Sequence, residues 1–231
     1  MIRAIIFDLD GTLADTEPIH FEAFAQIFHA EGIALSRDEY FTRLIGYNDH
    51  DCFKLLMDEQ GRPATPAQLQ SLIDRKAAVY QAMIAGRDVM YEGAAEFVRE
   101  CGRRFPLIVV TGTLRAEAEM ILGRARIREL FLDVIAAEDV DRGKPEPDGF
   151  LAGLGRIGFL LRPHPSIVST ECLVIEDTAA GVEAARHAGM PVLAVCHTAP
   201  AGQLAAADLV RPSLRETDLD DVLRRLAGRR S

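Results

Sequence analysis

Two carboxylates stand at the end of an apolar run near the start of the chain, in the segment 7–13 with the sequence FDLDGTL. If the run is a strand, Asp8 and Asp10 lie on the same side, about 7 Å apart along the backbone. Carboxylates at this spacing repel each other unless a cation or a shared proton compensates them. Gly11 lets a ligand approach the backbone, and Thr12 can hydrogen-bond an anion or cap a turn. The segment therefore predicts a charged site at a strand end.

A second set of candidate residues follows the apolar run 107–110. Thr111, Gly112 and Thr113 bring hydroxyl and backbone N–H groups to a place where a helix is expected to begin. Helix N-termini present unpaired N–H donors and therefore suit phosphate oxygens. The alternative interpretation is that these residues only form the N-cap of the helix and bind no ligand.

A lysine in a stiff turn adds a positive charge. Lys144 is one of only three lysines, beside 23 arginines, and lies in the segment 143–148 with the sequence GKPEPD. The prolines restrict the backbone of this turn, so that Lys144 supplies a point charge at a defined place. A solvated loop lysine is the alternative.

Two more carboxylates, Glu176 and Asp177, end a later apolar run. With Asp8 and Asp10 they form a set of hard oxygen ligands, which suits Mg²⁺ with its preference for carboxylates, water and a phosphate oxygen. Zinc is disfavoured because no cluster of His or Cys accompanies the acids. The sequence thus predicts a magnesium site made by Asp8, Asp10, Glu176 and Asp177.

Short apolar runs alternate with segments of helical periodicity and must position these residues. The runs lie at 4–7, 107–110, 134–137, 173–175 and 192–196. Continuous apolar runs of this length are typical of strands that are buried on both faces of a parallel sheet. Their alternation with helices predicts an α/β fold, with a doubly wound, Rossmann-like parallel sheet.

One region interrupts this alternation. Residues 16–85 contain only helical patterns, and we expect them to form a four-helix cap domain inserted after the first strand. Residues 1–15 and 86–231 would then form the α/β core. An insertion at that place is expected above the carboxyl ends of the strands, where such sheets bind ligands.

The composition limits the class of protein. The chain has 231 residues, a formal net charge of −9, 48% hydrophobic and 26% charged residues, which excludes global disorder. No apolar stretch approaches the roughly 20 residues of a membrane span, and an early acidic residue argues against a secretory signal. The acidic balance disfavours nucleic acid as a partner. Four cysteines without a C-x-x-C pair suit a reducing cytoplasm, which is the expected location.

These motifs together resemble the haloacid dehalogenase-like hydrolase superfamily, and within it the β-phosphoglucomutase-like or CbbY-like group with a helical cap. The resemblance covers residues 2–222 and includes DLDGT, TGT, GKPEPD and IEDTAAG in the expected order. It implies that Asp8 is the nucleophile of an aspartyl-phosphate mechanism and that Asp10 is the general acid and base. It also implies that Thr111 and the N–H of Gly112 hold the phosphoryl group, with Thr113 beside them. Lys144 would offset charge.

The resemblance also implies a metal site and a cap that closes over the cleft. Asp8, the backbone carbonyl of Asp10, and Asp177 with Glu176 would hold Mg²⁺. In the cap, Thr16 and His20 match a polar pattern after the nucleophile loop. Lys76 resembles a cap lysine that faces the active site. The alternative for Lys76 is a solvated helix face, and for His20 it is a helix-face histidine without substrate contact.

The chain departs from the group's pattern at several places. Mutases of the group carry Gly-x-Ser-Arg in the cap, whereas this chain has Gly46-Tyr47-Asn48-Asp49, and an acid there would repel a second phosphate. Gly112 lacks the side chain usual in the second motif, a contact that Arg115 could replace. The loop 156–171 is longer than usual, and His164 within it is expected to be a loop residue rather than a ligand.

These observations favour a Mg²⁺-dependent phosphatase of a small phosphorylated metabolite, most simply a sugar phosphate, acting as a monomer or weak dimer. A β-phosphoglucomutase-type mutase is the main alternative. A phosphonate hydrolase would need a Schiff-base lysine in the cap, for which Lys54 and Lys76 are the candidates. A non-catalytic binding module on the same fold is less favoured because the motifs are intact. Dehalogenation, another reaction of the superfamily, is disfavoured by Asp10 and by the carboxylates of the proposed magnesium site.

Overall fold

The computed structural model describes residues 1–163 and 166–228, and its internal contacts divide the chain into two units. One unit joins Met1–Asp15 to Met90–Ser231, and the other comprises Thr16–Val89. The sequence placed the end of the inserted unit at residue 85, so the structural unit extends slightly further. We call these the sheet unit and the helical unit.

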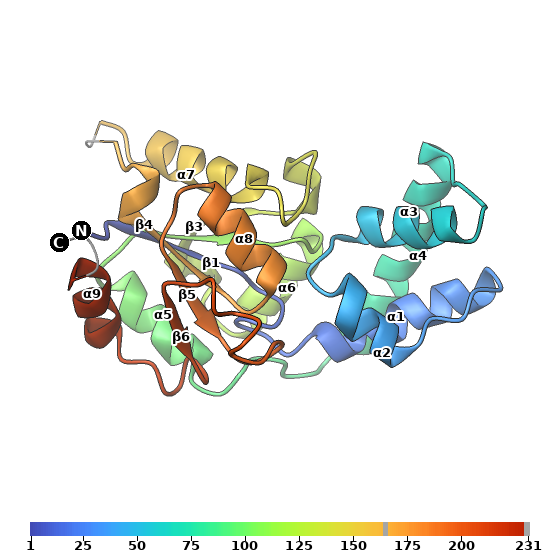
Figure 1. The fold of residues 1–231 in the computed structure, drawn as a ribbon, viewed down its shortest axis with the longest axis horizontal. Coiled ribbons are helices and arrows are strands. Elements are labelled where there is room, and N and C mark those ends of the chain that lie inside the picture. Colours follow the sequence, from blue (N-terminus) through green and yellow to red (C-terminus); the bar gives the residue numbers. More distant parts are fainter. Residues whose placement is uncertain (164–165, 229–231) are drawn as a thin grey trace. The chain divides into compact units, whose positions relative to one another are not determined.

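The sheet unit contains a six-stranded sheet with the order β3-β2-β1-β4-β5-β6, in which all neighbours are parallel (Figure 1). The strands are β1 (Ala4–Phe7), β2 (Leu107–Val110), β3 (Phe131–Ile135), β4 (Cys172–Glu176), β5 (Val192–Val195) and β6 (Leu209–Arg211). The order reverses at β1, which lies between β2 and β4. Because the carboxyl ends of parallel strands meet at one edge, side chains that follow β1, β2 and β4 converge there. This sheet confirms the predicted doubly wound α/β fold.

Two edge strands depart from the apolar runs of the sequence. β3 begins at Phe131 rather than at residue 134, and its Leu132 remains 39% exposed. β6 was not predicted. Edge strands are covered less completely than central ones, so their sequences need not be continuously apolar. The central strand β1 is completely buried, as its sequence predicts.

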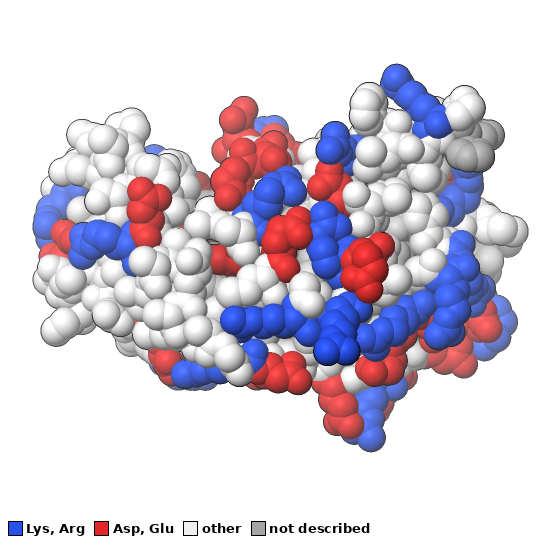
Figure 2. Space-filling view, turned by 180° about the vertical axis from the view of Figure 1, so that it is seen from behind, with Lys and Arg blue, Asp and Glu red and all other residues white. Residues whose placement is uncertain are grey.

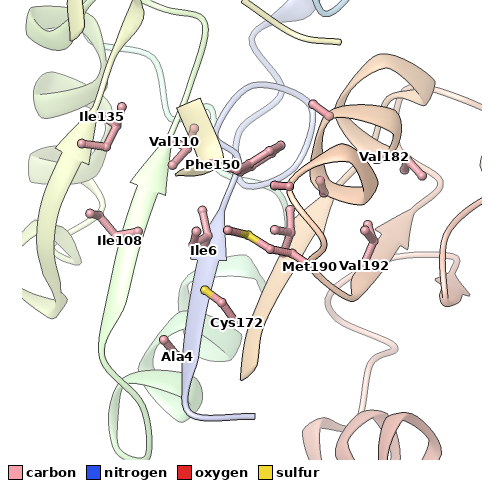
Figure 3. Packing of buried hydrophobic residues seen from close by; sticks show 14 of the residues in the cluster. Ala4, Ile6, Ile108, Val110, Ile135, Phe150, Cys172, Val182, Met190 and Val192 are labelled. Atoms are coloured by element: carbon pink, nitrogen blue, oxygen red, sulfur yellow. The ribbon is translucent and has the colours of Figure 1, made fainter. Parts of the chain in front are cut away.

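Helices cover both faces of the sheet. They are α5 (Ala94–Gly102), α6 (Arg115–Arg124), α7 (Asp148–Leu160), α8 (Ala179–His187) and α9 (Leu219–Gly228). Figure 3 shows Ile6, Ile108 and Val110 packed with Phe150 of α7. On the opposite face, the ring of Phe7 meets that of Phe97 in α5, with centroids 6.4 Å apart. Strand alternation therefore divides β1 between two cores, and each buried Ile or Phe contributes about 1.5–3 kcal/mol.

The helical unit consists of α1 (Glu17–Ala30), α2 (Arg37–Glu39), a π-helix η1 (Tyr40–Leu44), α3 (Asp49–Glu59) and α4 (Pro66–Ile84). Side chains of Ser36, Asn48 and Thr65 accept hydrogen bonds from the first turns of α2, α3 and α4. Such caps satisfy N–H groups that have no partner within the helix, so they determine where each helix begins. α4 packs against α1 and α3.

The surface charge is mixed rather than uniformly negative. Figure 2 shows a face on which basic side chains form a row with acidic side chains beside it. The net charge of −9 therefore does not describe the local field at any one place. Within the described part of the chain, every helix is too short or too polar to span a bilayer.

Candidate active site

A partly buried lysine, with 11% of its side chain exposed, joins two strand ends in the sheet unit. Lys144, in the turn before α7, donates from Nζ to Oδ1 of Asp8 at 2.5 Å and also to Oε1 of Glu176. Asp8 follows β1 and is 4% exposed, whereas Glu176 ends β4 and is completely buried. The stiff turn predicted from its prolines thus carries the ammonium group between two carboxylates.

Both carboxylate oxygens of Glu176 are engaged within the protein. Oε1 accepts from Lys144, and Oε2 accepts from the backbone N–H groups of Asp177 at 2.7 Å and Thr178 at 2.8 Å. A Cβ atom at Gly181 would overlap the same carboxylate, so glycine is needed for this close approach at the start of α8. In the structure Glu176 holds Lys144 and the N-terminus of α8, and its predicted role as a metal ligand stays a prediction.

Asp177 has an oxygen that the protein leaves unsatisfied. Thr12 donates from Oγ1 to Oδ1 of Asp177 at 2.7 Å. Oδ2 of the same residue is buried and accepts no well-aligned hydrogen bond from the described residues, although the hydroxyl of Thr198 lies close to this carboxylate and lowers its pKa. A Cβ atom at Gly11, where φ is +80°, would overlap this oxygen. A buried acceptor without a partner costs free energy, so Oδ2 marks the place where a further cation fits.

The site contains more negative than positive charge. Burial raises the pKa of Asp8, an effect opposed by Lys144 and strengthened by Glu176 and Asp10. Burial also raises the pKa of Asp177, together with Glu176 and Asp8. Burial by itself would lower the pKa of Lys144, but Asp8 and Glu176 outweigh it and raise that pKa. One ammonium therefore does not balance these four carboxylates, and a divalent cation would offset two more of their charges.

The acids do not form a ready metal cage. In the described ranges, no three His, Cys, Asp or Glu side chains are grouped so that they could hold a metal ion. Asp8 and Glu176 are instead arranged around the protein's own cation, Lys144. The fit to Mg²⁺ thus rests on the unsatisfied Oδ2 of Asp177 and on the excess of negative charge, in a donor set made of oxygens alone.

The second strand end contributes Thr111. Its Oγ1 donates to Oδ2 of Asp10 at 2.9 Å and accepts from the backbone N–H of Thr113 at 3.0 Å. The structure thereby brings Asp10 and Thr111 together, as their motifs predicted. The hydroxyl of Thr113 is buried and donates to Glu117 at 3.0 Å, so it is occupied inside the fold. Gly112 lies between the two threonines and adds no side chain.

Arg115 serves the fold rather than the site. Its guanidinium donates to the carbonyl oxygen of Val134 at 2.7 Å and to Asp139 at 2.5 Å. Its backbone N–H donates to Glu138 at the start of α6. These bonds tie α6 to β3 and the turn after it. The suggestion that Arg115 replaces a substrate contact is therefore not supported by its position.

The cap residues singled out from the sequence form a second buried cluster, within the helical unit. Lys76 on α4 is completely buried and donates to Asp49 at 2.8 Å, with His20 Nδ1 also at 2.8 Å. The rings of Phe24 and Tyr80 lie 5.0 Å from its Nζ. The acid at position 49 is thus paired with Lys76. The sequence argument that Asp49 repels a second phosphate did not include this partner, and its basis is weakened.

The remaining residues that the sequence analysis named have contacts or burial that do not by themselves indicate a functional role. Lys54 is exposed on α3 and pairs with Asp58 one turn away, at 2.7 Å. Thr16 is buried immediately before α1.

The segment 156–171 was predicted to be a loop, but α7 continues through its first residues to Leu160, and a short 3-10 helix, Ser169–Glu171, forms its end. Glu171 pairs with Arg3 at 3.0 Å. His164 lies outside the described residues.

Sequence reasoning missed two contributors to the site. Thr178 hydrogen-bonds Glu176 through both its N–H and its hydroxyl. His197 follows β5 and lies 3.0 Å from the carbonyl oxygen of Gly11. Thr178 could have been predicted, because it lies in the IEDTAAG motif. His197 could not, because a single histidine after an apolar run does not indicate a functional site.

Comparison with known proteins identifies the family and several relatives of the chain. A family model described as haloacid dehalogenase-like hydrolase matches residues 2–189. A phosphorylated carbohydrates phosphatase from Thermotoga maritima is 28% identical over 228 residues, covering 96% of this chain and 100% of that protein. Protein CbbY from Rhodobacter capsulatus is 30% identical over 199 residues, covering 83% and 84%.

The solved structures include a β-phosphoglucomutase from Clostridium difficile with a TM-score of 0.87, over 99% of both chains at 20% identity. At that identity the likeness concerns the fold alone. The family match and the phosphatase relative confirm the predicted enzyme class, a phosphoric monoester hydrolase. The chain belongs to the haloacid dehalogenase-like hydrolases, as its four motifs predicted.

Proposed function

We propose that this chain is a Mg²⁺-dependent phosphatase that hydrolyses a small phosphorylated metabolite, with a sugar phosphate as the substrate class. The observation that carries the proposal is the buried Asp8 carboxylate, held by Lys144 beside the unsatisfied oxygen of Asp177. The activity of the Thermotoga maritima relative on phosphorylated carbohydrates supports the substrate class.

In the first step, an oxygen of Asp8 attacks phosphorus while the bond from phosphorus to the ester oxygen breaks. Asp10 gives its proton to the departing alcohol oxygen, and an aspartyl-phosphate remains on Asp8. In the second step, Asp10 takes a proton from water, whose oxygen attacks phosphorus. The bond to Asp8 then breaks, inorganic phosphate leaves, and both carboxyl groups return to their starting states.

The surrounding residues make this attack possible by offsetting charge. Lys144 reduces the repulsion between the Asp8 carboxylate and an anionic phosphate, and Glu176 holds that ammonium in place. Thr111 orients Asp10 through its hydroxyl. Asp8, the backbone carbonyl of Asp10, and Asp177 would hold Mg²⁺. When bound, the metal supplies positive charge that neutralises the nucleophile and the phosphoryl oxygens.

A panel of phosphate esters with Mg²⁺ tests this proposal. Wild-type protein should release phosphate from at least one ester, and Asp8→Asn should reduce that release by about 10³-fold or more, because the amide is not a nucleophile. Asp74→Asn, the same substitution at an exposed place on α4, is the matched control and should change nothing. Equal release by wild type and Asp8→Asn would contradict the proposal.

A β-phosphoglucomutase-type reaction remains the second candidate, because Asp49 is paired with Lys76 and no longer counts clearly against it. Conversion of β-glucose 1-phosphate to glucose 6-phosphate without release of phosphate would favour the mutase. A phosphonate hydrolase is less well supported. Its lysine must lose a proton to form a Schiff base, whereas the hydrogen bond to Asp58 raises the pKa of Lys54 and Lys76 is enclosed beside Asp49.

Three further expectations stay predictions from composition and motifs. They are a cytoplasmic location, a monomer or weak dimer without nucleic-acid partners, and substrate contacts by Gly112, Thr113, His20 and Lys76.

A further inference from the structure

His197 connects the loop after β5 to the turn after β1. Its Nδ1 lies 3.0 Å from the carbonyl oxygen of Gly11. Its ring stacks on that of Tyr91, with centroids 3.9 Å apart and planes 27° apart. A carbonyl oxygen can only accept, so Nδ1 must carry the proton of this hydrogen bond. No motif of the family match accounts for this residue, which lies beyond the matched range 2–189.

The turn that His197 contacts carries two residues of the proposed site, Asp10 and Thr12. On its other side, this turn is tied to the strand-like segment at Met90–Tyr91. Ala14 forms a bridge with Met90, and the N–H of Tyr91 donates to the carbonyl oxygen of Leu13 at 3.0 Å. His197 is therefore one of several supports that hold the turn from different parts of the chain, together with the hydrogen bonds of Thr111 to Asp10 and of Thr12 to Asp177.

The support matters because the turn contains a glycine directly after Asp10. Gly11 has a φ of +80° and no side chain of its own to restrict it. The peptide between Gly11 and Thr12 is fixed at its carbonyl oxygen by His197. Since the same turn carries Asp10, a change in this peptide would change the direction of the Asp10 carboxylate.

We propose that His197 is a positioning residue that aims Asp10 at the leaving-group oxygen by holding the Gly11 carbonyl. The inference rests on the proposed function, in which Asp10 is the general acid. A catalytic group must be held within about 0.5 Å of its productive position by neighbouring residues, and the reaction slows when this restraint is lost. His197 acts through the turn and does not need to touch the substrate.

The test uses two esters that differ in their need for an acid. The p-nitrophenolate of p-nitrophenyl phosphate leaves without a proton, whereas the alkoxide of a simple alkyl phosphate requires one. His197→Phe keeps a ring for stacking and removes the donor. It should lower kcat/KM, which reports the steps up to departure of the alcohol, by about tenfold more for the alkyl ester than for the aryl ester. His197→Asn, whose amide nitrogen can replace Nδ1, should restore most of this difference.

Tyr91 supplies an independent pair of variants should His197→Phe fail to fold. Tyr91→Leu removes the ring on which His197 stacks and should give the same difference between esters. Tyr91→Phe keeps the ring and should not. Thermal unfolding of each metal-free variant checks that it is folded, independently of activity.

Equal losses on the two esters, or no recovery in His197→Asn, would overturn the positioning role, because a merely structural defect does not depend on the leaving group. Failure of the proposed function has a different signature. A folded wild-type protein that releases phosphate from neither ester with Mg²⁺ would refute the phosphatase proposal, and this inference with it.

Discussion

Two lysines are enclosed in this molecule, one in each unit, and their surroundings differ in charge balance. Lys76 in the helical unit meets one carboxylate, Asp49, and one imidazole, His20. Lys144 in the sheet unit meets the carboxylates of Asp8 and Glu176. Each ammonium also lies near aromatic rings, within 5.0 Å to 5.3 Å of a centroid.

The difference distinguishes a closed ion pair from a site that needs a ligand. Around Lys144, Asp10 and Asp177 add negative charge, and Oδ2 of Asp177 accepts no well-aligned hydrogen bond from the described residues. Around Lys76, the ammonium pairs directly with Asp49, and the nearby carboxylate of Glu17 accepts a hydrogen bond from the hydroxyl of Tyr40. A buried lysine is therefore not evidence of catalysis by itself. The surplus of carboxylates and an unsatisfied oxygen are the features that point to a bound cation and an anionic substrate.

The largest expected effect concerns stability of the helical unit. Lys76→Met should lower the free energy of unfolding by about 3–5 kcal/mol, because it leaves the Asp49 carboxylate buried without a counter-charge. The double variant Lys76→Met with Asp49→Leu should recover most of that loss. Urea unfolding measures both, and Lys54→Met at an exposed place on α3 is the matched control, with no measurable change expected. A double variant no more stable than Lys76→Met would show that the pair is not a closed unit.

The corresponding change in the sheet unit should affect catalysis. Lys144→Met should reduce phosphate release by about 10²–10³-fold, because the charge that offsets the approach of Asp8 to phosphate is removed. Lys144→Arg should also be less active than the wild-type protein, although it keeps the charge, because a planar guanidinium does not replace a compact ammonium between Asp8 and Glu176. Initial rates on the best ester of the panel measure this, with Lys54→Met again as control. A loss below tenfold for Lys144→Met would contradict the assigned role.

Magnesium should stabilise the protein through the carboxylates around Lys144 and not through the Lys76–Asp49 pair. Saturation at about 100 times the Kd should stabilise the wild-type protein by about 2.7 kcal/mol, and removal of metal by a chelator should stop phosphate release. Asp177→Asn should abolish the stabilisation, whereas Asp49→Asn should retain it. Unfolding with and without Mg²⁺ checks this for each variant. A full magnesium response in Asp177→Asn would remove this residue from the proposed metal site.

The smallest expected effects are changes in stability when one glycine in each unit is replaced by alanine. Gly32, after α1 of the helical unit, has a φ of +77° and open space around it. Gly32→Ala should cost about 1–2 kcal/mol from the left-handed conformation alone. Gly123 lies inside α6 of the sheet unit, also in open space, and Gly123→Ala should stabilise by about 0.5–1 kcal/mol. Thermal unfolding should therefore shift in opposite directions, and equal shifts would refute the conformational explanation.

Much of the site could be predicted from the sequence because parallel strands end at a common edge. Once the apolar runs at 4–7, 107–110 and 173–175 are interpreted as neighbouring strands, the polar residues after them must converge. Strand order alone therefore predicts that Asp8, Asp10 and Thr111 lie close together, and the hydroxyl of Thr111 donates to Asp10 in the structure. This prediction does not require knowledge of side-chain packing.

Local patterns were less informative for partners far apart in the chain. Nothing in the sequence around Asp49 indicates that its carboxylate meets Lys76, 27 positions later, or that Arg115 bonds to β3. Glu176 and Asp177 are adjacent and chemically alike. Yet the oxygens of Glu176 are engaged by Lys144 and the start of α8, and one oxygen of Asp177 is not.

The sequence by itself therefore determined the α/β class, the inserted helical region, and which residues stand at the strand ends, because periodicity and chain direction are local properties. Only the tertiary structure decided which carboxylates are satisfied, that Asp49 and Lys76 neutralise each other, and that His197 supports the turn beside Asp10. Those outcomes depend on the orientation of side chains in three dimensions, which packing between distant segments determines.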